Sequence, residues 1–159
     1  MKLTFDENGC LTPYQVIETD LDVFEKSFAF NKHRRNMFGK LLNLMEKLTL
    51  LDTGDYFLWV NGSFVTRKKF PKDIDLVTFI DYRLFNPLEK ALFTLGSQYE
   101  GALDCYFSRI FPENHKLHNV YQWAMQDWFQ LFSSTRVHPI SGQINPKGFI
   151  QLNSELILK

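Results

Sequence analysis

The sequence predicts an α/β (α+β) fold, in which a sheet carries helices on at least one face. The main observation is the order of the expected elements, which runs helix, strand, strand, helix, strand, helix, strand. The 159 residues, 45% of them hydrophobic, are enough for one buried core. No repeat, linker or low-complexity stretch divides them, so one domain spanning residues 1–159 is expected.

Ahead of the first strand of the sheet, the chain is expected to form an extended arm or short strand, through Pro13, and then two helices. The first helix starts at Thr19 or Asp20, since Asp20 can cap its first turn. In the second helix, an apolar stripe should pack on the sheet, while the basic residues fall mostly off that stripe. The stripe is Met37, Leu41, Leu42, Met45 and Leu48, and the basic residues are His33, Arg34, Arg35, Lys40 and Lys47.

Two strands follow, joined by a turn and a basic segment. Residues 56–60 are continuously apolar and β-prone, as in a strand buried on both faces, and residues 61–62 end this strand. Residues 74–80 form the next strand. Because side chains alternate along a strand, Asp75 points to the same side as Asp73, which lies just before it.

A helix, a strand, a long helix and a late strand complete the fold. Asn86 and Pro87 favour a helix start, with Asn86 as the cap. Residues 103–107 form a strand with Asp104 on the face opposite its apolar neighbours. The long helix carries apolar residues at helical spacing, and the late strand covers residues 148–152. The apolar residues of the long helix are Leu117, Val120, Tyr121, Ala124, Trp128 and Leu131.

Charge and composition limit what the protein can bind. The formal net charge is zero, so no whole-molecule field attracts nucleic acid or acidic membranes, and any anion binding must be local. With only two cysteines, no apolar leader in residues 1–6 and no apolar run of membrane-spanning length, we expect a cytoplasmic protein. The 16 Phe, 6 Tyr and 3 Trp either line a cleft or partner surface or fill an aromatic-rich core.

Segments 61–66 and 71–77 carry the residues most informative about function. Two carboxylates on one strand face, Asp73 and Asp75, can bridge two Mg²⁺ ions, for which carboxylate oxygens are suitable ligands. Asp104, on a neighbouring strand, can supply a third carboxylate. This set is typical of a site for a metal-bound nucleoside triphosphate, which makes nucleotidyl transfer the leading interpretation.

The turn between the two strands is suited to a phosphate. Gly62 lets the main chain approach a phosphate, and Ser63 offers a hydroxyl and an amide at a turn. Positive charge between the turn and the carboxylates comes from Arg67, Lys68, Lys69 and Lys72. Each feature alone also fits a plain turn, a solvated strand edge or a solvent-facing loop. Gly-Ser followed at one fixed distance by Asp-x-Asp is nevertheless expected by chance in only about one chain in a thousand of this length.

These residues resemble the pattern of the polymerase-β-like nucleotidyltransferase superfamily: a strand, Gly-Ser, a short connection, Asp-x-Asp on the next strand, and a third Asp on a later strand. The chain is most similar to small prokaryotic members that read roughly W-x-x-G-S-F-x-T-x-K and then P-x-D-I-D-L-V. The matching residues are Trp59, Gly62, Ser63, Phe64, Thr66, Lys68, Pro71, Asp73, Ile74, Asp75, Leu76 and Val77. The resemblance extends from the arm at residues 8–9 to Arg136 and residues 147–150.

The resemblance implies a mixed sheet of the nucleotidyltransferase fold with flanking helices, an NTP substrate, expected to be ATP, and Mg²⁺ or Mn²⁺. It assigns the triphosphate to a set comprising Gly62, Ser63, Thr66 and Lys68. It assigns catalysis and the metals to Asp73, Asp75 and Asp104, with Asp104 on the acceptor side. Two departures stand out. A second Gly shortly after the Gly-Ser pair is replaced by residues 66–68, and the large helical second domain of bigger members is not expected.

Several other residues have two interpretations. Arg136 and Lys147 could reach phosphates if their segment folds back over the sheet, but surface cations are the favoured interpretation. His115 and His118 have metal-ligand spacing without a third ligand nearby, which favours a surface pair at a helix start.

Four aromatic residues in or beside the long helix, Tyr121, Trp123, Trp128 and Phe132, could form a base-stacking wall. Core packing explains three of them equally well. Trp123 falls off the apolar stripe, so it is the better candidate for a ligand or partner contact.

The leading hypothesis is therefore an Mg²⁺-dependent nucleotidyltransferase that moves NMP from an NTP to a hydroxyl of a protein, an RNA or a nucleotide. A place in a toxin–antitoxin or anti-phage system is expected, because small relatives of the superfamily often sit there. The alternative is a non-catalytic partner of the same fold, antitoxin-like or a complex subunit, and a third hypothesis is a fold that binds a nucleotide without turnover. An operon-encoded protein or a second copy of the chain is the expected partner, and no membrane is involved.

Overall fold

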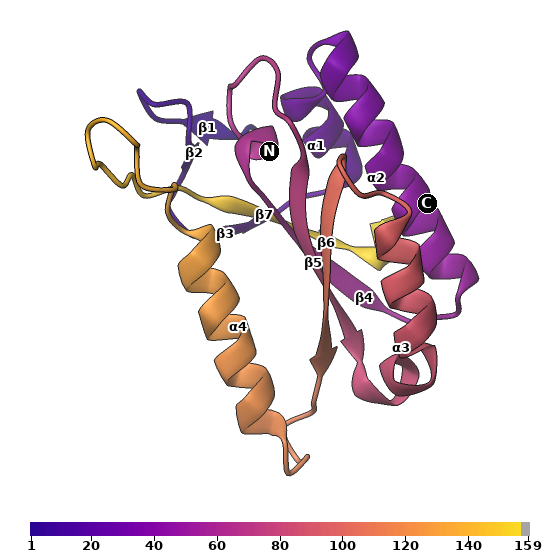
Figure 1. Cartoon of the computed structure of the whole chain (residues 1–159). Helices are drawn as coiled ribbons and strands as arrows, with labels where there is room; N and C mark the ends of the chain where they lie inside the picture. The colour runs from indigo at the N-terminus through magenta and orange to yellow at the C-terminus, as the bar shows by residue number, and fades with distance from the viewer. Residues whose placement is uncertain (157–159) are drawn as a thin grey trace.

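A five-stranded mixed sheet forms the centre of the structure, a computed structural model that describes residues 1–156 (Figure 1). Its strand order is β3 (Val16–Glu18), β7 (Phe149–Asn153), β4 (Tyr56–Asn61), β5 (Ile74–Asp81) and β6 (Leu103–Ile110). The β3–β7 and β5–β6 pairs are parallel, whereas β4 runs antiparallel to both of its neighbours. The predicted α/β (α+β) class with a mixed sheet is confirmed.

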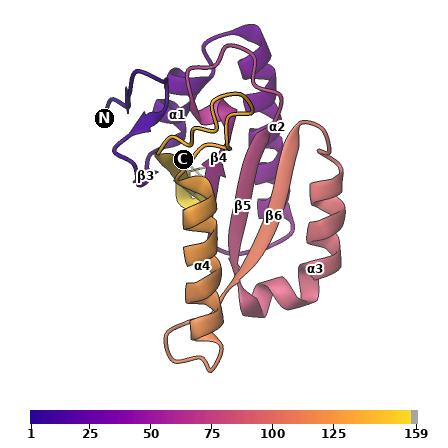
Figure 2. The ribbon, with the colours of Figure 1, turned by 60° about the vertical axis from the view of Figure 1, so that its left-hand side comes forward.

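Helices cover both faces of this sheet. α1 (Leu21–Phe28), α2 (Lys32–Leu50) and α3 (Tyr82–Ser97) bury their apolar residues against one face. α4 (His118–Phe132) packs on the other face over an aromatic cluster that contains Trp59, Phe79, Phe132 and Phe149. Figure 2 shows α4 across the sheet from α2 and α3. None of the helices in the described part of the chain is long and apolar enough to cross a membrane.

The N-terminal arm has more regular structure than the sequence predicts. β1 (Thr4–Phe5) and β2 (Leu11–Thr12) pair as a small antiparallel sheet, and β3 joins the edge of the main sheet. The Asp6 carboxylate closes the turn between β1 and β2 by accepting hydrogen bonds from the amides of Asn8 and Cys10, at 2.8 and 3.0 Å. The Gly9 amide also donates to the Asp6 carbonyl at 3.0 Å, and Gly9 has φ 77°, so residues 6–9 form a β-turn for which Asn8-Gly9 is a standard sequence signal.

Helix α3 begins five residues before the predicted start. The Asp81 carboxylate, at the end of β5, accepts a hydrogen bond from the Arg83 amide at 2.8 Å and so caps the helix. Asn86 is therefore not the cap, and Pro87 lies inside the helix. The Asn86 side chain instead accepts a hydrogen bond from Arg109 Nε at 2.7 Å.

The buried faces of α2 and α4 differ from the predicted stripes. Arg34, expected off the apolar stripe of α2, is fully buried. On α4, Val120 and Leu131 were predicted to belong to the buried stripe but are 46% and 62% exposed. The face that packs on the sheet is rotated about the helix axis relative to the predicted stripe. That face consists of Tyr121, Met125, Trp128, Phe129 and Phe132.

Candidate functional site

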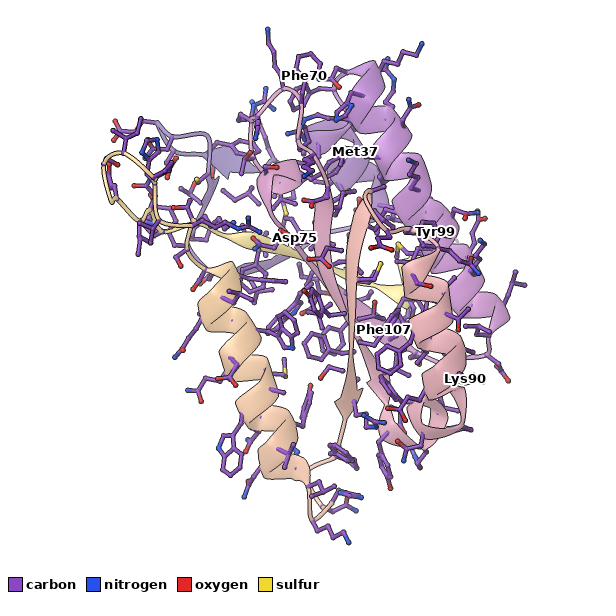
Figure 3. The ribbon with its side chains drawn as sticks, in the orientation of Figure 1. Met37, Phe70, Asp75, Lys90, Tyr99 and Phe107 are labelled. Atoms are coloured by element: carbon purple, nitrogen blue, oxygen red, sulfur yellow. The ribbon has the colours of Figure 1, made fainter. Side chains whose placement is uncertain are left out.

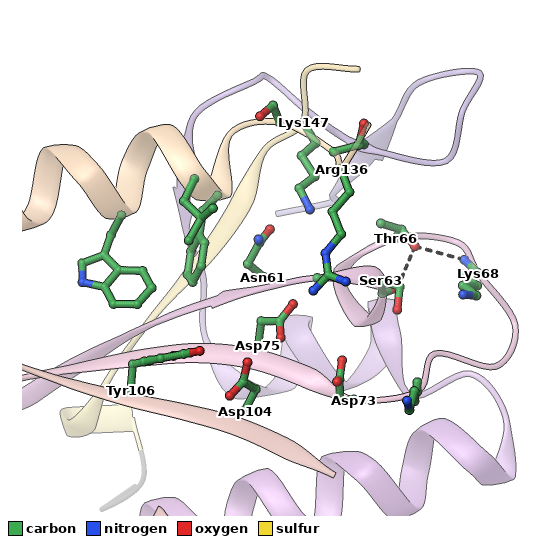
Figure 4. Close-up of a pocket in the computed structure, with 17 residues that line it drawn as sticks. Asn61, Ser63, Thr66, Lys68, Asp73, Asp75, Asp104, Tyr106, Arg136 and Lys147 are labelled. Carbon is green, nitrogen blue, oxygen red and sulfur yellow. Dashed lines mark hydrogen bonds between the residues drawn. The ribbon is translucent and has the colours of Figure 1, made fainter. Parts of the chain in front are cut away.

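The structure brings all seven residues predicted to form the site to one cleft of about 680 Å³ (Figure 4). These residues are Gly62, Ser63, Thr66, Lys68, Asp73, Asp75 and Asp104. The cleft lies where β4 ends and β5 and β6 begin, and α4 and the segment after it form its opposite wall. A cleft of this size is in the range of small-molecule sites.

The register of the sheet aligns the acidic residues. Asn61 pairs with Asp75 between β4 and β5, and Asp75 pairs with Asp104 between β5 and β6. Paired residues point to the same face, so these three side chains form one row, and Asp73 precedes Asp75 by two residues on that face. Figure 3 shows Asp75 in the interior near the middle of the molecule, with Phe107 directed toward α3.

The carboxylates of this row act on one another electrostatically. Burial is the largest cause that raises the pKa of Asp75, and the negative charges of Asp73 and Asp104 raise it further. Arg136 and Lys147 act in the opposite direction. A bound cation stabilises most strongly a carboxylate whose ionisation is opposed by burial and by neighbouring carboxylates. The arrangement around Asp75 therefore favours a cation at this position.

Oxygen donors of this kind suit Mg²⁺ or Mn²⁺, and Asp73, Asp75 and Asp104 are the residues that would hold such an ion. As the side chains stand, no group of three His, Cys, Asp or Glu within residues 1–156 converges on one metal position. To hold one ion together, the three carboxylates would therefore have to move closer to one another. Their mutual repulsion opposes this approach when no cation is bound. His115 and His118 likewise belong to no such group.

Gly62 is held against the central carboxylate. Its φ of 86° and ψ of −170° belong to a backbone region that is essentially limited to Gly. A Cβ at this position would lie only 2.6 Å from Asp75 Oδ2. The structure thus supplies a reason for Gly62 that the sequence does not, which is room for the Asp75 carboxylate.

The Thr66 hydroxyl closes the turn that follows Gly62. The short helix η1 (Ser63–Val65) follows Gly62, and the Thr66 hydroxyl donates to the Ser63 carbonyl at 2.6 Å. The same hydroxyl accepts from the Lys68 amide at 3.2 Å, as the dashed lines of Figure 4 mark. Thr66 therefore shapes the turn while it lines the cleft.

The basic residues of this loop separate into two groups. Lys68 and Lys72 line the cleft, as expected. Arg67 does not line it, because its guanidinium lies over the rings of Phe30 and Phe5, 4.7 and 5.3 Å from their centroids. Of the four basic residues of this loop, Lys68 and Lys72 therefore supply positive charge to the cleft.

Arg136 and Lys147 both line the cleft. The favoured interpretation as a surface cation is wrong for Lys147, which is buried, whereas Arg136 is exposed. The segment that carries them folds back over the sheet, with the Lys147 amide donating to the Ser133 carbonyl at 2.9 Å. Lys147 is only 8% exposed, and its ammonium forms no ion pair or hydrogen bond with any residue that the structure describes. Burial lowers its pKa. The side chain is mostly buried, but its ammonium reaches the cleft, where it has no partner among the described residues. An anionic ligand in the cleft would offset this partly desolvated charge.

Aromatic residues form the end of the cleft away from the loop. Tyr106 and Trp128 line it with ring centroids 5.0 Å apart, and Phe132 lies beside Trp128. The charge of Asp104 is the main cause that raises the pKa of the Tyr106 phenol. Trp123, the predicted contact residue, is 64% exposed and lies outside the cleft.

A family model for a family of unknown function matches residues 3–153. The chain belongs to this family, DUF6932. No curated protein matches the chain, and no solved structure matches it either. The DUF6932 match spans every residue named in the cleft, from Asn61 to Lys147, so the cleft lies entirely inside the family's shared region.

Two further residues of the DUF6932 cleft were missed by sequence reasoning. Asn61 was interpreted only as the end of a strand, yet its side chain is 5% exposed and its Oδ1 has no hydrogen-bond partner in the described residues. Tyr106 shares a strand face with Asp104 two residues earlier, and this alternation could have identified it.

Proposed function

We propose that this protein is an Mg²⁺-dependent nucleotidyltransferase that moves NMP from an NTP, expected to be ATP, onto a hydroxyl acceptor in a protein, an RNA or a nucleotide. The observation that carries the proposal is the row of carboxylates beside a turn and lysines in one cleft. The resemblance of Gly62–Ser63 and Asp73-x-Asp75 to the polymerase-β-like pattern supports the same reaction. Other anion-binding clefts do not require three carboxylates in the same place.

In the proposed reaction, the loop residues bind the phosphates and the carboxylates bind the metal. Ser63 donates a hydrogen bond to the β- and γ-phosphates, and Lys68 and Lys72 offset their charge. Asp73, Asp75 and Asp104 hold the metal, which when bound neutralises the phosphates and acidifies the acceptor hydroxyl.

The acceptor oxygen forms a bond to the α-phosphorus while the bond to the β-phosphate oxygen breaks, and pyrophosphate leaves. The acceptor proton passes to Asp104, the most exposed of the three carboxylates, and then to water. Lys147, with its unpaired ammonium at the cleft, opposes the negative charge that develops on the phosphates.

The test is transfer of label from α-phosphate-labelled NTP in the presence of Mg²⁺, with the protein itself, RNA and nucleotides offered as acceptors. The double variant Asp73→Ala, Asp75→Ala should lose transfer and keep its fold. Asp127→Ala, which removes an exposed carboxylate from α4 outside the cleft, is the matched control and should retain transfer. Equal transfer by the double variant and the control would sink the assignment.

A second candidate is an interaction protein, either a toxin–antitoxin or anti-phage component or a complex subunit. It is favoured by the exposed apolar tip of the segment after α4, where Val137, Ile140 and Ile144 are 58%, 91% and 55% exposed. An operon-encoded protein or a second copy of the chain in the cytoplasm would be the partner. The mark of this function is a stable complex that survives loss of both Asp73 and Asp75.

A further inference from the structure

The first turn of α2 holds the loop that forms one wall of the cleft. The Asn31 side-chain amide donates to the Lys69 carbonyl at 2.7 Å. His33 Nε2 lies 2.6 Å from the Pro71 carbonyl, and because a carbonyl oxygen can only accept, this ring nitrogen carries the proton. The loop is thus attached to the helix through main-chain oxygens.

Arg34 makes the most contacts of this kind. Its fully buried guanidinium donates to five main-chain carbonyls. The distances are 2.9 Å to Phe28, 3.3 Å to Ser63, 2.7 Å to Phe64, 2.9 Å to Thr66 and, from Nε, 2.9 Å to Lys68. It also lies over the rings of Phe30 and Phe64, 4.3 and 5.0 Å from their centroids. Within residues 1–156, no carboxylate forms an ion pair with it.

A buried guanidinium without a carboxylate is an unusual way to stabilise a fold. The carbonyls satisfy its hydrogen bonds but leave its charge uncompensated, and apolar residues of the same volume are often at least as stabilising. Burial is the main reason that the pKa of Arg34 falls to about 10, with the charge of Arg67 adding to it, so the guanidinium is still charged at neutral pH. The charge therefore sits directly beneath a loop whose outer side faces the cleft.

The carbonyl contacts decide what this loop presents to a ligand. Ser63, Thr66 and Lys68 all line the cleft, and all three direct their carbonyl oxygens onto Arg34. Carbonyl oxygens carry partial negative charge and would repel a phosphate. With these oxygens turned inward, the loop offers the cleft the Ser63 hydroxyl and the Lys68 ammonium instead.

On the opposite side, the arm holds the same loop in place. The Gly9 carbonyl accepts from the Arg67 amide at 3.1 Å, and Cys10 forms a bridge with Thr66. The loop is therefore clamped between Arg34 and the arm. These contacts explain how the loop keeps its shape without a second Gly. Many small members of the polymerase-β-like superfamily have that Gly where this chain has Thr66, Arg67 and Lys68.

We propose that Arg34 is a positioning residue for polyphosphate binding: it holds the carbonyls of residues 63–68 away from the cleft and places a positive charge beneath them. The proposal rests on the proposed function, since it takes the ligand of this loop to be the triphosphate of the NTP. Arg34 touches no ligand itself, so its effect passes through the loop.

The test compares Arg34→Lys and Arg34→Met with the matched control Arg35→Met, whose side chain is exposed one position later on the same helix. Inorganic tripolyphosphate is the probe, because it contains the phosphates without a base or acceptor, and its Kd is measured by calorimetry. Both Arg34 variants should bind tripolyphosphate at least about tenfold more weakly, although Arg34→Lys keeps the charge. Hydrogen exchange of the amides of residues 63–68 should be faster in both, while exchange in β5 is unchanged.

Wild-type affinity and wild-type exchange in Arg34→Lys would overturn the proposal, as would equal effects in Arg35→Met. If the variants do not fold, the Arg34 Nε–H resonance of the wild-type protein provides the measurement. Tripolyphosphate should shift this resonance together with the amides of residues 63–68, and a shift of the amides alone would contradict the positioning role.

The proposed function fails separately if the wild-type protein binds tripolyphosphate but transfers no nucleotide to any acceptor. Absence of tripolyphosphate binding by the wild-type protein overturns the polyphosphate role, whatever the transfer assay gives.

Discussion

Replacing Gly62 with Ala should disturb both the main chain and the central carboxylate of the cleft. Gly62 has φ 86° and ψ −170°, and holding Ala in such a region costs about 1–3 kcal/mol. For a chain of this size each kcal/mol lowers Tm by about 2–4 °C, so the expected loss is about 2–12 °C. The Ala Cβ would lie 2.6 Å from Asp75 Oδ2, where real Cβ contacts are not shorter than 3.0 Å.

The Asp75 carboxylate must therefore move by at least about 0.4 Å, the difference between these two distances. Misplacing a reacting group by up to an ångström costs on the order of 100-fold in rate, so Gly62→Ala should reduce nucleotide transfer by about 10- to 100-fold. The assays are thermal unfolding followed by circular dichroism and transfer from α-phosphate-labelled NTP.

Gly101→Ala is the matched control for this substitution. Gly101 has φ 90°, so Ala is strained there too, but nothing lies within 4 Å of the added Cβ. Gly101→Ala should lose stability and keep full transfer, because only Gly62 abuts a carboxylate. The reasoning would be refuted by a Gly62→Ala protein with wild-type Tm, or by equal transfer in the two variants.

Three further substitutions test the electrostatics and the helices. Burial and two neighbouring carboxylates raise the pKa of Asp75 in the folded protein above the ordinary Asp value of about 3.9 that applies to the unfolded chain. The folded state therefore loses stability as the pH rises from the unfolded pKa through the folded pKa and Asp75 ionises. Asp75→Asn without metal should therefore have a higher Tm than wild type at neutral pH and lose this advantage in acid; a lower neutral Tm would contradict this. Lys147→Met keeps a long apolar stem at a mostly buried position and removes only an unpaired ammonium at the cleft, so Tm should not fall, while the Kd for tripolyphosphate measured by calorimetry should rise about 10- to 100-fold; unchanged Kd would exclude Lys147 from the binding site. Gly39→Ala fills exposed space in α2 with nothing within 4 Å of the new Cβ, so urea unfolding should show a gain of about 0.5–1 kcal/mol, and a loss would refute the helix-propensity argument.

Local rules predicted the elements that depend on neighbouring residues. Asp20 caps α1 by accepting from the Val23 amide at 2.8 Å, as its position before an apolar periodic segment indicates. Strand alternation correctly placed Asp73 and Asp75 on one face, because side-chain direction along a strand follows from covalent geometry. All seven predicted site residues consequently reach one cleft.

One error arose between two competing local signals, and the others occurred where a distant partner outweighed a local signal. Asn86–Pro87 is a good helix start, but Asp81 at the end of β5 had already capped the helix. Lys147 looked like a surface cation although it directly precedes the predicted strand at residues 148–152, because the sequence does not show that this strand pairs with β4 beside the cleft. Arg34 lay off the apolar stripe of α2, yet its acceptors include the Lys68 carbonyl, 34 residues away.

By itself, the sequence determined the elements, the side of each strand that carries a carboxylate, and the residues to expect in a phosphate site. Only the tertiary structure decided that β5 and β6 pair so that Asp75 meets Asp104, that Lys147 folds back over the cleft, and that Arg34 holds the loop by its carbonyls. The physical reason is the range of the interactions. Capping and alternation act over one to four residues, whereas register, chain reversal and buried hydrogen bonds depend on residues that only packing brings together.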